Sequence, residues 1–241
     1  MSADDTGSLG AVARTAPATS TLTETEPVSE ERPRHGPGIY DRNVSQGTRL
    51  RAQRRTLIDT GALVFARHGR ANASVAHVLE ASRLSRGTFY RHFRSLGELF
   101  LAVERDAADV LCARLETAVA SVTDPSDRLR RWIEAYLEFC SERTDLLRVL
   151  HLGAHSNGSN SSSMHRSMRT RIERLLRDGL VRAARQRLIR EAPDAIAVEG
   201  FVGGVESVAV RYVDEQRQHE LHEALEPLVR LACRVFVANT R

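Results

Sequence analysis

The chain contains 241 residues, of which 41% are hydrophobic, 27% are charged and 5% are aromatic. It has no run of about 18 apolar residues, so we expect no membrane span. The acidic N-terminus is followed by no apolar stretch of signal-peptide length, so we expect a cytoplasmic protein. Cys112, Cys140 and Cys233 form no CxxC motif and cannot all pair with one another, which favours buried free thiols.

Positive charge is concentrated in one part of the sequence. Residues 48–106 contain eleven arginines and five acidic residues, a net charge of +6, whereas residues 1–47 carry −3 and residues 107–241 carry +1. A localised basic region attracts polyanions, and nucleic acid is the most common of them. The charge distribution therefore predicts that residues within 48–106 bind nucleic acid.

The first 45 residues differ in composition from the rest of the chain. They are rich in Ser, Thr, Ala, Pro and Gly and contain few large apolar side chains, so we expect residues 1–45 to be a disordered arm. From Thr48 the apolar residues recur with helical spacing, and Gly69 is suited to end the helix. The apolar residues that share one face of this helix are Leu50, Leu57, Ile58, Ala62 and Phe65.

Two short helices are expected next, inside the basic region. The hydroxyl of Ser74 can cap a helix that runs to about Ser82, and Ser85 can cap another over residues 86–93. A helix, a short turn and a second helix within a positively charged segment are typical of a helix-turn-helix, whose second helix enters the DNA major groove.

The second of these helices has an aromatic side and a polar side. Phe89 and Phe93 are four residues apart and fall on one side, with Tyr90 beside them. A helix of two turns is not stable alone, so we expect the aromatic side to pack against the preceding helices and the polar side to face DNA. Gly87, near the start of the helix, lets the backbone approach the nucleic acid closely.

Three segments of this region, "LVFARHG" (63–69), "ASVAHVLEASRLSRGTFYRHF" (73–93) and "LGELF" (96–100), resemble the DNA-binding domain of the TetR (tetracycline-repressor) family. The resemblance covers about fifty residues and departs from the family at two positions. Arg83 stands where a turn glycine is usual, and Leu96 stands where a phosphate-binding lysine is frequent. The resemblance implies a helix-turn-helix domain over residues 46–95 and a helical ligand-binding and dimerisation domain over 96–241.

The rest of the chain reads as helices, and the expected fold is all-α. We expect one helix over residues 97–121, two more in the region of Trp132 and Leu147, a mobile polar loop at 156–163 and a long helix from Met164 to Ile189. Two last helices carry apolar stripes, Val198 to Tyr212 and Leu221 to Val235. We expect them to form an antiparallel hairpin, which the family resemblance implies is the homodimer interface; the alternative is a hairpin packed on its own domain.

The candidate DNA-binding residues have assigned roles. Arg86, Thr88 and Arg91 are expected to contact base edges, whereas Tyr90, His92 and Ser74 are expected to hydrogen-bond phosphates. The alternative is an ordinary solvated helix face. The full set is Arg49, Ser74, Arg86, Gly87, Thr88, Tyr90, Arg91 and His92.

A ligand cavity in the second domain is implied by the family resemblance alone. Its candidate wall residues are Trp132, Tyr136, Phe139, His151, His155, Met168 and Phe201, most of which could equally be core. His151 and His155 have metal-chelating spacing but no acidic third ligand nearby, so we expect neither a metal nor a cofactor.

These patterns predict a transcriptional regulator, a dimeric repressor that a small-molecule ligand releases from a palindromic double-stranded DNA operator. One alternative is a non-specific architectural DNA-binding protein without effector control. Another is an enzyme domain after residue 107, which the absence of a catalytic motif disfavours.

Overall fold

The structure is a computed structural model that describes residues 39–154 and 159–237, and all of its regular elements in these ranges are helices. The all-α prediction is thus confirmed. In chain order the elements are α1 (Ile39–Asn72), α2 (Val75–Ser82), α3 (Arg86–His92), α4 (Leu96–Val119), α5 (Pro125–Glu142), α6 (Thr144–Ala154), α7 (Ser159–Arg185), α8 (Ala195–Asp214), the 3₁₀ helix η1 (Gln218–Ala224) and α9 (Leu225–Phe236).

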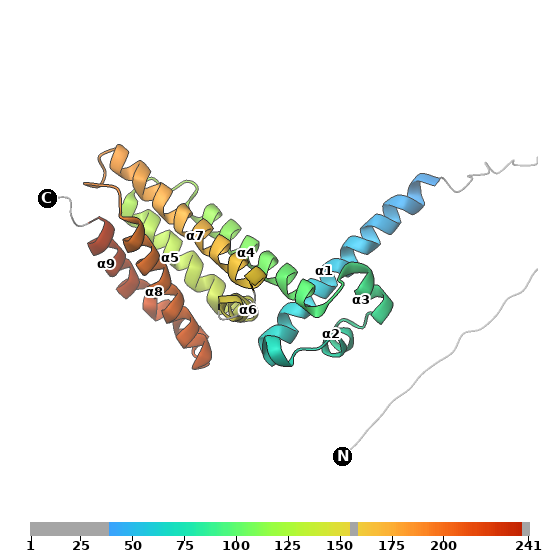
Figure 1. The fold of residues 1–241 in the computed structure, drawn as a ribbon. Coiled ribbons are helices and arrows are strands. Elements are labelled where there is room, and N and C mark those ends of the chain that lie inside the picture. Colours follow the sequence, from blue (N-terminus) through green and yellow to red (C-terminus); the bar gives the residue numbers. More distant parts are fainter. Residues whose placement is uncertain (1–38, 155–158, 238–241) are drawn as a thin grey trace, which may run out of the picture.

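The helices form two groups joined by α4. Figure 1 shows α1, α2 and α3 at one end, α5, α7, α8 and α9 at the other, and α4 running between them. One hydrophobic core continues through both groups, from Leu57 in α1 to Phe236 in α9. None of the helices within the described ranges is both long enough and apolar enough to cross a membrane.

Polar side chains fix the starts of five helices. Each accepts a hydrogen bond from a backbone N–H two or three residues later, which satisfies one of the donors that a helix N-terminus leaves unpaired. These capping residues are Ser74, Ser85, Ser95, Asp124 and Asp194. The helix starts predicted at Ser74 and Ser85 are confirmed.

The bounds of α1 and α7 differ from the sequence-based prediction. α1 begins at Ile39, within the segment expected to be disordered, and Gly69 interrupts it with a left-handed φ of 70° as expected. α7 begins at Ser159, so the predicted loop is wrong for residues 159–163; residues 155–158 lie outside the described ranges. Weak helix formers without Gly or Pro cost only about 0.5 kcal/mol each, so an established helix extends through them.

The end of α7 is also earlier than the apolar pattern predicts. The helix stops at Arg185, and the backbone reverses at Arg187, which has a left-handed φ of 58°. The N–H of Leu188 donates to the carbonyl of Ala183 at 2.9 Å, which closes the last turn. Ile189 is buried, but it lies in the segment after α7. Its helical spacing from the earlier apolar residues therefore led to a predicted helix end that is too late.

The three thiols are free, as the sequence predicts, but only two of them are buried. Cys112 and Cys140 are buried, Cys233 is half-buried, and all three are free. Burial raises the pKa of the Cys112 thiol to about 11, and it raises that of Cys140 as well, so both stay protonated at neutral pH.

The α4–α5 corner depends on one arginine lying over one glycine. Arg128 Nη1 donates to the carbonyls of Val119 (2.6 Å) and Val122 (3.2 Å), which satisfies the C-terminal end of α4. A Cβ added at Gly179 in α7 would overlap the Arg128 guanidinium. The glycine therefore leaves room for the arginine that closes the corner.

We expect Gly179→Ala to lower the free energy of unfolding by about 1–2 kcal/mol, because Arg128 must give up its carbonyl contacts. In an Arg128→Ala background the same change should stabilise the chain by up to about 1 kcal/mol, since only the helix propensity of alanine remains. Urea denaturation of the four proteins of this cycle measures both values. Equal effects in the two backgrounds would contradict the role given to Arg128.

Candidate nucleic-acid interface

The short helix α3 is held by its aromatic side, as predicted. The side chains of Phe89 and Phe93 are 0% and 2% exposed, and their ring centroids lie 6.1 Å apart. They join a core that includes Phe65 of α1 and Val78 of α2. Tyr90 packs edge-on against Phe89 but remains 50% exposed, so its hydroxyl is available to an external partner.

The turn between α2 and α3 adopts the conformation that the family resemblance implies. Arg83 ends α2 in the left-handed region, with φ 55° and ψ 23°. A side chain with a Cβ is strained there by about 1–2 kcal/mol. The Ser82 hydroxyl accepts the N–H of Leu84 at 3.3 Å and helps to hold this turn.

The opposite side of α3 faces solvent and contains no acidic residue. Arg86, Gly87 and Arg91 are exposed, whereas Thr88 is half-buried and its hydroxyl lies 2.9 Å from that of Ser85. Both arginines are exposed, and the guanidinium fork of each can make a bidentate contact with guanine. The structure thus places Arg86, Gly87, Tyr90 and Arg91 together on an accessible surface.

His92 is more enclosed than the sequence suggests. It is half-buried, and its Nε2 lies 3.5 Å from Oε1 of Gln53 in α1. Burial, with smaller contributions from Arg91 and Arg54, lowers the pKa of His92 below 6.5. At neutral pH the ring is therefore uncharged, and any phosphate contact would be a neutral hydrogen bond and not an ion pair.

The arginines of the first half of α1 are of two kinds, exposed and ion-paired. Arg49, Arg51 and Arg54 are exposed, and the guanidinium of Arg54 lies 5.3 Å from the centre of the Phe93 ring, which holds it next to the end of α3. Arg55, by contrast, pairs with Asp59 and Asp106 at 2.6 Å each. Arg55 therefore links α1 to α4, and this pairing removes it from the set of arginines available to DNA.

The start of α4 completes this surface. Ser95 caps the helix, and the carboxylate of Glu98 accepts the backbone N–H of Arg94 at 2.7 Å. Leu96 is apolar and half-buried against the core, so no charged side chain is available at this position to bind a phosphate. Ser74 accepts the N–H of His77 at 3.2 Å, and its hydroxyl stays beside the N-terminal amides of α2.

The predicted cavity residues form an aromatic cluster in the second group of helices. Trp132, Tyr136 and Phe139 of α5 and Phe201 of α8 are all buried. The rings of Trp132 and Tyr136 stack with centroids 5.6 Å apart, and Phe201 lies 6.5 Å from Trp132. These four side chains therefore belong to the continuous core.

The remaining cavity candidates are spread more widely. Met168 is buried and lines a hollow between α4 and α7, and His151 is half-buried in α6. His155 lies outside the described residues, so the distance between His151 and His155 is not defined. Within the described ranges no group of three His, Cys, Asp or Glu side chains could hold a metal ion.

Comparisons with known proteins agree with this architecture. Residues 57–103 match the family described as bacterial regulatory proteins, tetR family, and residues 122–215 match the tetracyclin repressor-like C-terminal domain. The first match contains α2, α3 and the start of α4, and the second contains α5 to α8.

Two curated relatives are transcriptional regulators. An HTH-type transcriptional repressor of Mycobacterium tuberculosis is 31% identical over 125 residues, with 41% of this chain and 66% of the relative covered. The HTH-type transcriptional activator FasR of Mycolicibacterium smegmatis is 31% identical over 107 residues, with 44% and 49% covered. The chain therefore spans about half to two thirds of the length of these relatives.

Solved structures share the fold at low sequence identity. The fatty acid degradation regulator FadR from Bacillus halodurans has a TM-score of 0.69 at 17% identity and covers 74% of this chain and 93% of its own. FadR from Bacillus subtilis, in complex with stearoyl-CoA, has a TM-score of 0.65 at 16% identity and covers 73% and 97%. The two family matches show that the chain belongs to the TetR family of DNA-binding transcriptional regulators, and the solved structures share its fold.

Proposed function

We propose that the protein is a dimeric repressor whose two α3 helices bind a palindromic operator, and that a small-molecule effector releases it. One α3 helix reads only a few base pairs, whereas two copies about 34 Å apart read both halves of a palindrome. An effector that favours a different spacing of the two helices would lower operator affinity.

The observation that carries this proposal is the direct packing of α4 against α1. A Cβ added at Gly61 would lie 3.1 Å from the side chains of Leu99 and Val103, so the two helix backbones approach closely. The ion pair between Arg55 and Asp106 adds a second link between the same helices. A shift of α4 would therefore be transmitted to the group of helices that contains α3.

The effector would bind where helices of the second group pack on α4. The indole Nε1 of Trp132 is buried and has no hydrogen-bond acceptor among the described residues, so an acceptor on a ligand would satisfy it. A fold neighbour is a fatty acid degradation regulator, and another is named as a complex with stearoyl-CoA. An effector with a long apolar chain is the class we propose.

Operator release tests this function. An operator selected from genomic fragments would be titrated with the protein in the presence and absence of stearoyl-CoA and of cell extract. An effector that binds the released state a hundredfold better supplies about 2.7 kcal/mol, which lowers operator affinity about a hundredfold. Operator affinity that no addition changes would contradict effector control.

The proposed dimer would form through α8 and α9. Ile196, Leu231 and Val235 are large apolar side chains on these helices that are 77%, 49% and 41% exposed. Cβ atoms added at Gly200 or Gly204 would meet nothing within 4 Å, so this face of α8 is flat and accessible to a partner helix. Burial of such residues against a second copy would stabilise the dimer by removing apolar surface from water.

We expect Leu231→Glu to convert the dimer into a monomer, because the dimer would bury an unpaired carboxylate, at a cost of several kcal/mol. Sedimentation velocity measures the mass, and circular dichroism should show an intact fold since the position is exposed in the single chain. Leu63→Glu is the matched control, since Leu63 is 58% exposed on α1 and should leave the mass unchanged. A dimer that tolerates Leu231→Glu would place the interface elsewhere.

A further inference from the structure

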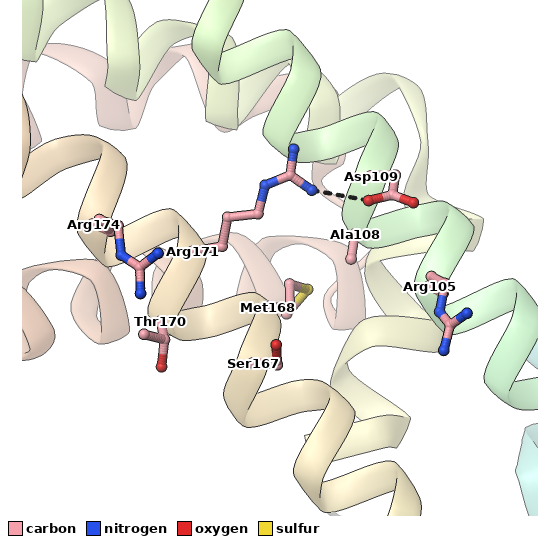
Figure 2. A pocket seen from close by; sticks show the side chains of 8 residues that line it. All are labelled: Arg105, Ala108, Asp109, Ser167, Met168, Thr170, Arg171 and Arg174. Atoms are coloured by element: carbon pink, nitrogen blue, oxygen red, sulfur yellow. Dashed lines mark hydrogen bonds and ion pairs between the residues drawn. The ribbon is translucent and has the colours of Figure 1, made fainter.

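A hollow of about 350 Å³ lies between α4 and α7, on a part of the surface that the DNA interface does not use. Figure 2 shows Met168 of α7 beside Ala108 of α4, with Arg105 and Arg174 on opposite sides of them. Met168 and Ala108 are each 7% exposed, so the floor of the hollow is apolar. An apolar floor between arginines is suited to a molecule that is part hydrocarbon and part anion.

The arginines around this hollow are not equally engaged. Arg171 is held by Asp109 at 2.9 Å and by Glu116 at 3.1 Å, and the first of these ion pairs is drawn in Figure 2. Arg105 and Arg174 are exposed and form no ion pair or hydrogen bond with another side chain of the described residues. Among these five charged side chains, Asp109 and Glu116 are both engaged by Arg171, so Arg105 and Arg174 are the cations without an acidic partner in the described ranges, and the net charge of the group is +1.

The position of the hollow along α4 is also informative. Arg105 directly precedes Asp106, the residue whose carboxylate pairs with Arg55 of α1. A ligand that draws Arg105 and α7 together would act on α4 next to its link with the DNA-binding helices. The apolar chain of such a ligand would lie on Met168 and Ala108, whereas its anionic end would remain at the arginines.

We propose that this hollow binds an amphipathic effector through its anionic groups, phosphate or carboxylate, with Arg105 and Arg174 as the ligands at opposite sides of the hollow. Guanidinium groups bind both anions through paired N–H donors. The assignment deepens the effector control proposed above and rests on it. Binding should weaken at high ionic strength, because both arginines are exposed to solvent and screened by salt.

The test is calorimetric titration of the full chain, without DNA, against four probes: stearoyl-CoA, stearate, coenzyme A and inorganic phosphate. The variant is Arg105→Gln with Arg174→Gln, and the control is Arg177→Gln with Arg185→Gln, which removes the same charge from exposed positions of α7 that do not line the hollow. The variant should bind stearoyl-CoA or stearate about tenfold more weakly than the wild type, and the control should not.

Each outcome decides a separate question. Binding of coenzyme A or phosphate alone that depends on Arg105 and Arg174 assigns the site to a phosphate, whereas dependence seen only with the two stearoyl probes assigns it to an anion on an apolar chain. Binding of none of the probes, or equal loss in variant and control, overturns the site. Operator release measured in parallel separates the two proposals: release that is unchanged in the variant refutes the site alone, and arginine-dependent binding without release refutes effector control alone.

Discussion

Replacement of Arg86 and Arg91 by glutamine is expected to lower operator affinity at least about thirtyfold. Each bidentate contact between an arginine and a guanine contributes about 1–3 kcal/mol of discrimination, and both arginines of α3 are exposed. The fold should be unchanged, because neither side chain contributes to the core beneath the helix.

Fluorescence anisotropy with the selected operator, at fixed physiological salt, measures this loss. Arg177→Gln with Arg185→Gln on α7 is again the charge-matched control, and it separates base recognition from a general loss of positive charge. Affinity for a scrambled duplex should fall much less than affinity for the operator. If the α3 variant bound the operator as tightly as the control, α3 would not be the recognition helix.

Phe89→Ala is expected to destabilise the DNA-binding helices by about 3–5 kcal/mol. The ring is fully buried between α1, α2 and α3, and truncation leaves a cavity in a part of the core that a seven-residue helix cannot refill. Because α3 is too short to be stable alone, operator binding should be lost together with the packing.

Tyr90→Ala is the matched comparison, since Tyr90 is the next residue of the same helix and is 50% exposed. It should change the free energy of unfolding by no more than about 0.5 kcal/mol and weaken only the binding of DNA. Urea denaturation followed by circular dichroism, with operator titrations of both variants, measures the two effects. Similar stabilities of the two variants would contradict the packing role of Phe89.

The recognition region could be predicted from sequence because its determinants are local. Ser74 and Ser85 cap helices within three residues of themselves, and the four-residue spacing of Phe89 and Phe93 defines a buried side. The contacts that fix His92 and Arg54 could not be predicted, because they join α1 to the α3 region across about forty residues of sequence. Such contacts exist only after the three helices have packed.

The candidate effector site was less accessible to sequence reasoning. Aromatic content directed attention to Trp132, Tyr136, Phe139 and Phe201, which the structure places in the core. Among the cavity candidates, Met168 alone lines the hollow between α4 and α7 in the part of the chain that the structure describes. Arg105 and Arg174 could not be singled out from the sequence, because all 35 basic residues of the chain are arginine. Only the ion pairs of the folded chain distinguish the engaged arginines from the unengaged ones.

The last predicted helix also differs from the structure. The apolar stripe from Leu221 to Val235 predicts one continuous helix, but the segment divides into η1 and α9 at Leu225. Leu221 is buried from η1, whereas Val235 is exposed on α9. The single apolar stripe therefore belongs to two different surfaces. Its first part packs in the core of the chain, and its last part faces the proposed partner.

The most direct test of the account is the ratio of affinities for a selected palindromic operator and for a scrambled duplex of equal length, measured at one physiological salt concentration. A sequence-reading α3 dimer predicts a preference of at least about a thousandfold, which is the lower end for specific DNA-binding proteins. Equal affinities would mean that the basic surface binds phosphates without reading bases, and would identify an architectural DNA-binding protein instead of an operator-specific regulator.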